Sequence, residues 1–304
     1  MPSMPGCERQ WQSAVLSTHR LHFEQADGMQ QALRDGFFFV QPAQTFDLAP
    51  GDHFARHFYL PASPGDLRNR AYRGFCARTE AELGRHQGYF CRGADQTEQF
   101  FLRSSHWHAL LPEALRIQAQ CMKALAIEVL LAVLAYLDIP PALWRKATGH
   151  CMASKGTHTL TFNHFRPQVR ARGLNIHKDS GWVTVLRSLE PGLEVLRHGR
   201  WCPIDPRPGC FIVNFGCAME ILTRHTATPV AAVAHRVVQQ PHEPGKADRF
   251  SYALFLDSSL DKRFCKGLYR YRSAHGLELE IDFEQFLNTI LKHTYEPHSV
   301  GLYE

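Results

Sequence analysis

The chain has 304 residues, of which 44% are hydrophobic and 21% are charged, and its formal net charge is +5. This composition is typical of an ordinary globular protein and excludes a disordered or fibrous one. The length suits one large domain. Basic residues are spread along the chain instead of forming a block. This spread disfavours nucleic acid as a partner, and the mild positive excess favours an anionic small molecule.

Membrane and secretion signals are absent from the sequence. No unbroken apolar run approaches the ~20 residues that a bilayer span requires, and no basic segment followed by an apolar one opens the chain. The nine cysteines form no Cys-x-x-Cys pair, so neither a zinc knuckle nor a disulfide framework is indicated. We therefore expect a cytoplasmic protein without membrane contact. No oligomeric state is favoured.

The first 150 residues favour helices over strands. Residues 1–20 are polar and lack periodicity, which predicts a loose leader. The sequence then predicts a short helix, a buried strand and a second helical segment, at residues 28–34, 36–40 and 47–58. From Pro112 to Leu137, apolar residues recur at spacings of three and four. This spacing predicts one long amphipathic helix that braces the core.

After about residue 150, short β-rich runs separated by Pro and Gly turns dominate. They lie at residues 158–165, 182–189, 192–196, 210–214, 230–238 and 250–256, and a helix is predicted at 281–291. We therefore expect a mainly β fold with flanking helices, built as a double-stranded β-helix, or jelly roll. Residues 1–150 would form an N-terminal α/β region packed on the jelly-roll core at 151–304, and both would belong to one catalytic unit.

Two histidines and one aspartate in the second half could bind a metal. His177 and Asp179 are two residues apart beside a β-forming run, so both side chains would face one way on a strand. About one such His-x-Asp pair arises by chance in a chain of this composition. His235 lies in an apolar strand, where a hydrogen-bonded core histidine is the alternative. Together, two imidazoles and one carboxylate can hold one face of an Fe(II) ion and leave the other open.

Arg249 and Ser251 lie two residues apart on a later predicted strand and would face the same way. A guanidinium inside a barrel needs an anionic partner, and its planar fork suits two-point binding of an acid. The hydroxyl of Ser251 would add a donor to that acid. The alternative is an arginine that pairs with a structural carboxylate at the barrel edge.

The order of these blocks resembles the isopenicillin N synthase-like family of Fe(II)/2-oxoglutarate-dependent dioxygenases, and most nearly its deacetoxycephalosporin C synthase-type members. The blocks that carry the resemblance are residues 35–40, 160–167, 175–186, 192–195, 199–201, 208–216, 220–223, 234–237 and 249–251. The resemblance implies a jelly-roll core in which His177, Asp179 and His235 bind Fe(II). It implies that Arg249 and Ser251 bind the far carboxylate of 2-oxoglutarate. The co-substrate and O2 would be consumed, succinate released, and a hydrogen atom removed from an unactivated carbon.

The same resemblance suggests further contacts. Asn163 is a 2-oxoglutarate contact, whereas Phe165 stands where many members carry a Tyr that helps to bind this co-substrate. Arg73 matches a block that holds an anionic substrate, with a surface arginine as the alternative. Arg166 and Trp182 flank the expected mouth and, with Arg73 and Phe165, complete the expected substrate contacts.

The expected function is hydroxylation, desaturation or ring modification of a small, amino-acid-derived natural-product intermediate. Three alternatives stay open. One is an iron oxidase of the same superfamily that takes no 2-oxoglutarate and binds the acid of its substrate through Arg249 and Ser251. The others are a non-catalytic jelly-roll binding module and a zinc hydrolase with the same ligands. The pattern does not separate hydroxylation from desaturation, because both begin with the same hydrogen abstraction.

Overall fold

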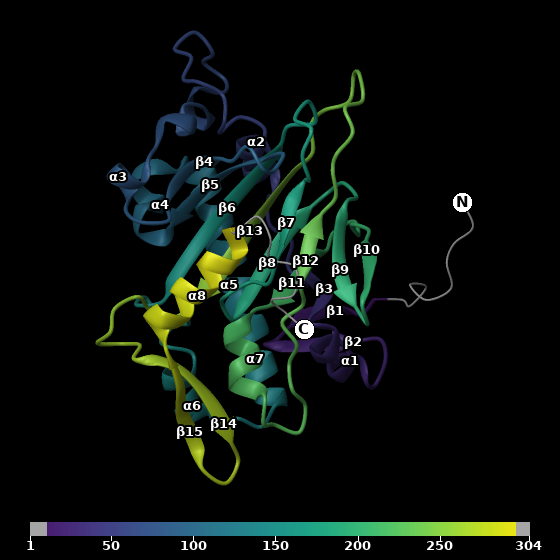
Figure 1. Cartoon of the computed structure of the whole chain (residues 1–304), viewed down its shortest axis with the longest axis vertical. Coiled ribbons are helices and arrows are strands. Elements are labelled where there is room, and N and C mark those ends of the chain that lie inside the picture. Colours follow the sequence, from purple (N-terminus) through teal and green to yellow (C-terminus); the bar gives the residue numbers. More distant parts are fainter. Residues whose placement is uncertain (1–10, 296–304) are drawn as a thin grey trace, which may run out of the picture.

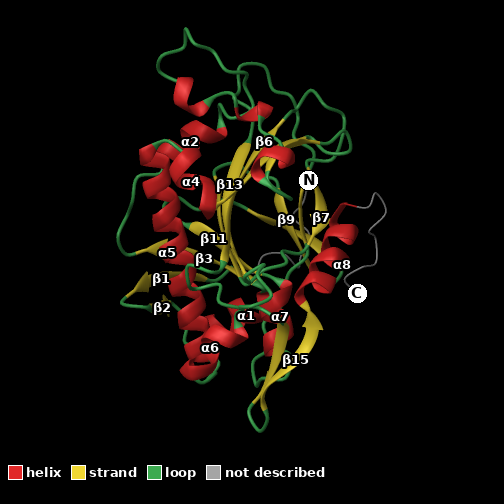
Figure 2. Cartoon of the chain, turned by 90° about the vertical axis from the view of Figure 1, so that its left-hand side faces the viewer, coloured by secondary structure: helices red, strands yellow, loops and turns green. Residues whose placement is uncertain are grey.

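The structure, a computed structural model, describes residues 11–295. It contains two β-sheets that face each other across the centre of the molecule, with helices around them (Figure 2). The strands of the larger sheet are β1 (Ser13–Ser17), β2 (Arg20–Phe23), β3 (Phe37–Pro42), β4 (Gly88–Cys91), β5 (Thr97–Arg103), β6 (Thr157–Phe165), β8 (Val183–Ser188), β11 (Phe211–Phe215) and β13 (Phe250–Asp257). The strands of the smaller sheet are β7 (Leu174–His177), β9 (Leu193–Arg197), β10 (Arg200–Ile204) and β12 (His235–Val237).

Helices surround these sheets, and one hairpin extends away from them (Figure 1). The helices are α1 (Gly28–Asp35), α2 (Ala49–Ala55), α3 (Glu80–Leu83), α4 (Ser104–Leu110), α5 (Glu113–Tyr136), α6 (Pro141–Ala147), α7 (Cys217–Thr223) and α8 (Phe283–Tyr295). Two short 3-10 turns lie at η1 (Arg70–Tyr72) and η2 (Phe75–Ala77). The hairpin consists of β14 (Gly267–Arg272) and β15 (Gly276–Asp282), and α8 packs against it and against β7.

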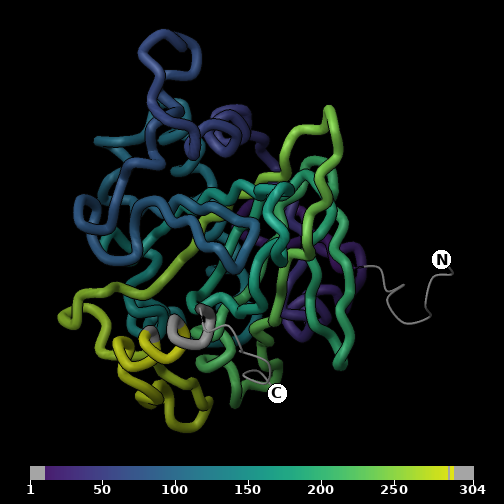
Figure 3. Tube along the Cα trace, turned by 45° about the horizontal axis from the view of Figure 1, so that its top comes forward, coloured from purple at the N-terminus to yellow at the C-terminus, as the bar shows by residue number. Residues whose placement is uncertain are grey.

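The strand order explains why the fold is one unit. The larger sheet runs β2-β1-β3-β11-β8-β13-β6-β5-β4 and the smaller runs β10-β9-β12-β7. Strands from both sides of residue 150 therefore share one sheet, because β3 pairs with β11 and β5 pairs with β6. Figure 3 shows the purple N-terminal segment lying beside green strands from the second half. The two sheets are those of an open jelly roll.

The expectation of a loose leader up to residue 20 is wrong for the described residues 11–20. Residues 13–17 form β1, in which Ala14 and Leu16 are buried while Val15 is exposed. This alternation is that of an ordinary half-buried strand, and parallel pairing with β3 holds it in the sheet. Residues 1–10 lie outside the described residues.

Alternate residues of the larger sheet face the space between the sheets. The pairing registers place one residue from each of five neighbouring strands in a single row across the sheet: Arg103, Thr159, Phe255, Thr184 and Asn214. Because side chains on a strand alternate in direction, this register turns a mostly polar set of side chains towards the interior space. The opposite face packs under the helices.

The predicted long helix is present as α5. Its buried side packs against β8 and β13, on the outer face of the larger sheet (Figure 2). By length and composition α5 could cross a membrane, but half of its most apolar stretch is buried inside the fold. Burial of this kind is typical of the core helix of a globular protein.

A buried polar network fastens α5 and α2 to the larger sheet. The side chain of Gln118 on α5 accepts a hydrogen bond from the Gly51 N–H at 2.7 Å and donates to the Tyr252 hydroxyl at 2.8 Å. That hydroxyl donates to the Asp52 carboxylate at 3.0 Å, which also pairs with Arg187 at 3.0 Å. Each polar group is satisfied only while the two helices and the sheet stay in register.

Replacing Gln118 by Met should therefore destabilise the fold at nearly constant side-chain volume. The Gly51 N–H and the Tyr252 hydroxyl would lose their buried partner, which costs about 1–3 kcal/mol of unfolding free energy. Chemical denaturation measures this change. Gln120→Met on the exposed side of the same helix is the matched control. Equal stability of the two variants would contradict the network's role.

Candidate metal and co-substrate site

A cavity of about 640 Å³ lies between the two sheets. Its lining combines residues of the larger sheet, such as Asn163 and Ser251, with residues of the smaller sheet, such as His177 and His235. Residues of α8, including Phe283 and Asn288, contribute to the same lining. A cavity of this size fits a small organic molecule.

The cavity brings the three predicted metal ligands together. His177 ends β7 and pairs directly with His235, the first residue of β12. The Asp179 Oδ1 atom lies 3.8 Å from Nε2 of His177 and 3.6 Å from Nε2 of His235. One detail of the sequence prediction is wrong: the strand ends at His177, so Asp179 lies in the following loop. Convergence comes from the loop and not from strand alternation.

The start of α7 holds the loop that carries Asp179. The Cys217 N–H donates to the Asp179 carbonyl at 2.8 Å. Gly216 lies against the same loop so closely that a Cβ there would be 2.3 Å from the Gly181 carbonyl oxygen. A residue without a side chain is therefore required at this position for the loop to keep its place.

The ring orientations leave lone pairs facing a carboxylate. Nδ1 of His177 lies 2.9 Å from the Asn175 carbonyl and Nδ1 of His235 lies 3.1 Å from the Val233 carbonyl. Carbonyls accept hydrogen bonds, so each Nδ1 carries the proton and each Nε2 keeps its lone pair. Burial and the neighbouring His235 lower the pKa of His177 to about 4, which keeps that ring neutral.

This donor set fits a metal ion. The ligand atoms of His177, Asp179 and His235 all lie within 4.8 Å of one another. Asp179 Oδ2 is buried and has no hydrogen-bond partner in the part of the chain that the structure describes. A buried carboxylate that faces two imidazole lone pairs is unfavourable unless a cation joins them. Two imidazoles and one carboxylate on one face are the set that non-haem Fe(II) prefers.

A second polar group without a full set of partners lies in the same cavity. Arg249 precedes β13 and is 6% exposed. Its Nη2 donates to the Ser188 hydroxyl at 3.0 Å and its Nε to the Pro191 carbonyl at 3.1 Å, while Nη1 has no partner within the described residues. Burial lowers the pKa of Arg249 to about 10, so the guanidinium still carries its charge at neutral pH.

Ser251 and Asn163 lie together beside this guanidinium. They are direct partners in the pairing of β13 with β6, and the Asn163 side chain donates to the Ser251 hydroxyl at 3.2 Å. The Asn163 carbonyl oxygen in turn accepts from Gln99 at 2.8 Å. This chain fixes the Asn163 amide, so the Ser251 hydroxyl keeps its own proton for another acceptor.

The four predicted substrate contacts do not line the cavity. Phe165 is fully buried, and the Arg249 guanidinium lies 4.4 Å from its ring centre, so the ring supports the guanidinium by a cation–π contact. Trp182 is also fully buried and donates from Nε1 to the Ser258 hydroxyl at 3.0 Å. Both residues belong to the packing around the site.

The two predicted arginine contacts have partners elsewhere. Arg73 pairs with Asp66 at 2.9 Å, outside the cavity lining, and hydrogen bonds from Asn69 and Arg73 lower the pKa of Asp66. Arg166 donates to the backbone carbonyls of Arg92 and Asp95 at 3.1 and 3.0 Å. Arg166 therefore fastens a loop and is not turned to the cavity.

The structure adds cavity residues that the sequence reasoning missed. Thr157, Thr159 and Thr161 line the cavity from β6, and Arg103 and Asp257 line it from β5 and β13. Burial and the nearby Asp179 carboxylate raise the pKa of Asp257 to about 7. The signal was present in the sequence, because polar residues alternate with apolar ones from Thr159 to Asn163.

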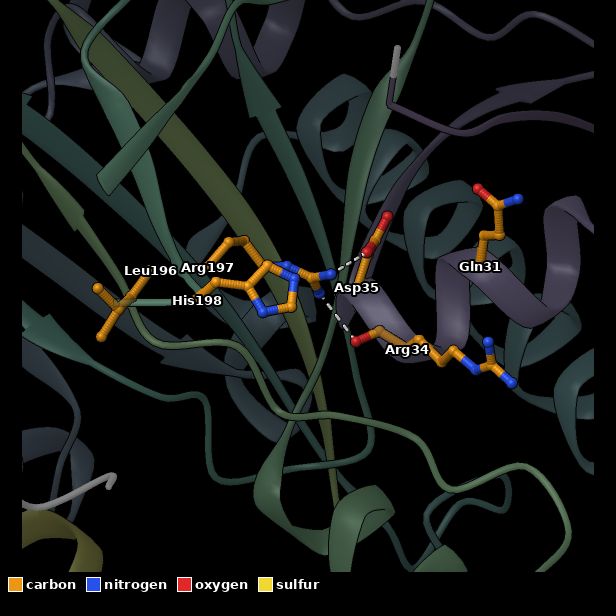
Figure 4. Close-up of a pocket in the computed structure, with 6 residues that line it drawn as sticks. All are labelled: Gln31, Arg34, Asp35, Leu196, Arg197 and His198. Carbon is orange, nitrogen blue, oxygen red and sulfur yellow. Dashed lines mark hydrogen bonds and ion pairs between the residues drawn. The ribbon is translucent and has the colours of Figure 1, made fainter. Parts of the chain in front are cut away.

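A separate hollow of about 420 Å³ lies outside the barrel, between α1 and the turn that joins β9 to β10. Figure 4 shows Arg197 pointing from β9 to the Asp35 carboxylate and to the Arg34 carbonyl, which accepts a hydrogen bond at 2.9 Å. Asp35 is buried and paired, so its charge is balanced within the protein. This contact ties the smaller sheet to α1.

Comparisons with known proteins agree with this geometry. Residues 156–258 match the family model of the 2OG-Fe(II) oxygenase superfamily. The oxoglutarate-dependent flavonoid 7-O-demethylase 1 of Ocimum basilicum is 28% identical over 170 residues, which cover 53% of this chain and 42% of that protein. Gibberellin 3-beta-dioxygenase 2-3 of Triticum aestivum is 42% identical over 90 residues, which cover 29% and 22%. The chain thus matches about half or less of the length of these curated relatives.

A solved structure with the same fold is the dioxygenase for auxin oxidation of rice. Its TM-score is 0.59 at 22% identity, and the alignment covers 88% of this chain and 90% of that chain. This likeness confirms the expected fold, a mainly β jelly roll with flanking helices. The matched residues 156–258 include the metal-ligand set and Arg249 with Ser251. Over residues 156–258 the chain is thus similar to the 2OG-Fe(II) oxygenase superfamily.

Proposed function

We propose that the chain is an Fe(II)- and 2-oxoglutarate-dependent oxygenase that hydroxylates, desaturates or ring-modifies a small natural-product intermediate, with amino-acid-derived molecules as the first candidates. One observation carries the proposal. A metal-ligand set with an unpartnered carboxylate oxygen shares a cavity with a buried guanidinium that has an unpartnered Nη1. The match of residues 156–258 to the 2OG-Fe(II) oxygenase superfamily supports the same function.

Each group would have a defined task. His177, Asp179 and His235 would hold Fe(II), which with 2-oxoglutarate and O2 supplies an oxidant strong enough for an unactivated carbon–hydrogen bond. Arg249 would bind the far carboxylate of 2-oxoglutarate through Nη1, and Ser251 would donate its hydroxyl proton to the same group. The metal and the guanidinium would then orient the two ends of the co-substrate before the prime substrate enters.

The first test is conversion of 2-oxoglutarate to succinate. Protein loaded anaerobically with Fe(II) and then exposed to O2 should form succinate, slowly without a prime substrate and faster with one. His177→Ala should lower this rate by more than about 100-fold, because a metal ligand is lost. His242→Ala, at an exposed position, is the control. Bound iron without succinate would indicate an oxidase that takes no 2-oxoglutarate.

The second test concerns the metal alone. Asp179→Asn keeps the size of the side chain but removes the negative charge, so we expect Mn(II) to bind more than about 100-fold more weakly, since even the loss of an outer hydrogen bond costs 10–100-fold. Calorimetric titration measures this affinity. Asp205→Asn, on the surface, should leave it unchanged. Failure of the wild-type protein to bind one Mn(II) per chain would instead favour a non-catalytic binding module.

The third test separates the co-substrate from the metal. Arg249→Gln should weaken 2-oxoglutarate binding to the Mn(II)-loaded protein by roughly 10- to 100-fold, because a charge-assisted pair is lost. Arg249→Lys should lose less, since it keeps the charge but not the planar fork. Mn(II) affinity should stay the same in both variants, as in the exposed control Arg200→Gln. Unchanged 2-oxoglutarate affinity in Arg249→Gln would rule out this role.

A further inference from the structure

The cavity lining includes a half-buried arginine, Arg103, that lies far from Arg249 along the larger sheet. Arg103 is the last residue of β5, and Gln99, Phe101 and Arg103 line the cavity from alternate positions of that strand. Three strand spacings of ~4.8 Å separate β5 from β8 along the row that contains Arg103 and Thr184. Arg103 therefore lies on the other side of the cavity floor from Thr184.

The guanidinium of Arg103 is only partly satisfied. Its Nη2 donates to the Arg85 carbonyl at 2.9 Å, and among the described residues no carboxylate lies within ion-pair distance of it. The side chain is half-buried, and burial lowers the pKa of Arg103. A half-buried cation without a counter-ion has a strong electrostatic reason to bind an anion.

Other cations of the cavity lining differ from Arg103 because they have partners. Lys178 pairs with Glu220 at 3.4 Å, and Lys262 pairs with Glu284 at 2.7 Å. Arg249 has hydrogen bonds at two of its three nitrogens and is assigned to 2-oxoglutarate above. Arg92 donates to the Gln99 side chain at 2.7 Å, and Arg85 and Lys266 are exposed. Among the described lining residues, Arg103 is therefore the half-buried cation that we consider for a ligand.

The nearest acidic group is a weak counter-charge. Asp257 is close enough to raise the pKa of Arg103 against the effect of burial, but it does not contact the guanidinium. Asp257 therefore balances only a part of the charge of Arg103.

Aromatic residues lie directly beside this cation. Phe101 is its neighbour on the inner face of β5, and Phe255 lies in the same cross-strand row two strands away. Phe90 packs edge-on against Phe101 at 5.6 Å between ring centres and also lines the cavity. An apolar body that ends in an acid group would satisfy both kinds of neighbour at once.

We propose that the prime substrate is an apolar carboxylic acid whose carboxylate binds Arg103 while its apolar body lies on Phe101 and Phe255. This inference rests on the proposed function and names its substrate class. The substrate is thus still expected to be an anion, but the residue proposed to bind it is Arg103 and not Arg73. Arg103 would fix which carbon of the substrate lies over the open face of the metal site.

The test uses protein saturated with Mn(II) and 2-oxoglutarate, so that acids cannot occupy the co-substrate site. Phenylacetate, 3-phenylpropanoate and octanoate are titrated by calorimetry beside their neutral amides. At least one acid should bind roughly tenfold or more tightly than its amide, since a charge-assisted hydrogen bond is lost in the amide. Arg103→Gln should remove this preference, and Arg103→Lys should keep part of it. The exposed control Arg68→Gln should behave as wild type.

The outcomes separate the two levels of the proposal. Wild-type protein that does not bind Mn(II) and 2-oxoglutarate would overturn the proposed function and this inference with it. Protein that binds both, but binds acids and amides equally or not at all, would overturn the substrate class alone. The same holds if Arg103→Gln keeps the acid preference with Mn(II) and 2-oxoglutarate affinity intact. Tighter binding of phenyl phosphate than of any of the acids would overturn the choice of a carboxylate.

Discussion

Two imidazole lone pairs and a buried carboxylate point at one another inside the barrel, and this arrangement is unfavourable until a cation joins them. The surrounding structure holds them there. Backbone carbonyls fix the protons on the outer ring nitrogens of His177 and His235, so neither ring can turn its lone pair away. The close approach of Gly216 to the loop prevents Asp179 from relaxing. The fold thus keeps the three ligands in place although, without a cation, their arrangement lowers its stability.

Such a site needs two sheets at a fixed separation, because the histidines come from the smaller sheet and most of the cavity floor from the larger one. The network around Gln118 fastens α5 and α2 to the back of the larger sheet. On the other side, Arg197 and Asp35 join the smaller sheet to α1, and β3 follows α1 directly into the larger sheet. Ion pairs and hydrogen bonds have steep directional demands, so they define a separation that apolar packing alone would leave looser.

Much of the fold could be predicted from the sequence, because periodicity is a local property. The β-rich run at 158–165 and the apolar spacing from Pro112 to Leu137 placed β6 and α5 to within a residue or two. The apolar run at 230–238 misled, since only residues 235–237 form a strand. Residues before them are buried by irregular contacts, such as the bond from the Ala231 N–H to the Leu33 carbonyl. Buried residues that are not paired in a β-sheet show the same hydrophobic pattern in the sequence as a strand.

The predictions for the candidate site were also right for some residues and wrong for others. His177 and Arg249, predicted as a metal ligand and a co-substrate contact, line one cavity, whereas Arg73 and Trp182, predicted as substrate contacts, are not part of its lining. A single arginine in a sequence does not reveal whether a carboxylate will meet it in the fold, as Asp66 meets Arg73.

The net charge of the chain is a poor guide to which anionic ligands it binds. The excess of +5 counts Lys178 and Lys262 equally with Arg103, although the first two are neutralised by pairing. Binding is decided by charges that are desolvated and left without a counter-ion, because only these gain a partner that water does not already provide. Among the described residues, Arg249 and Arg103 have no carboxylate within ion-pair distance, and they lie at separate places in one cavity. Two separate cations would allow two different acids to be bound in this cavity together.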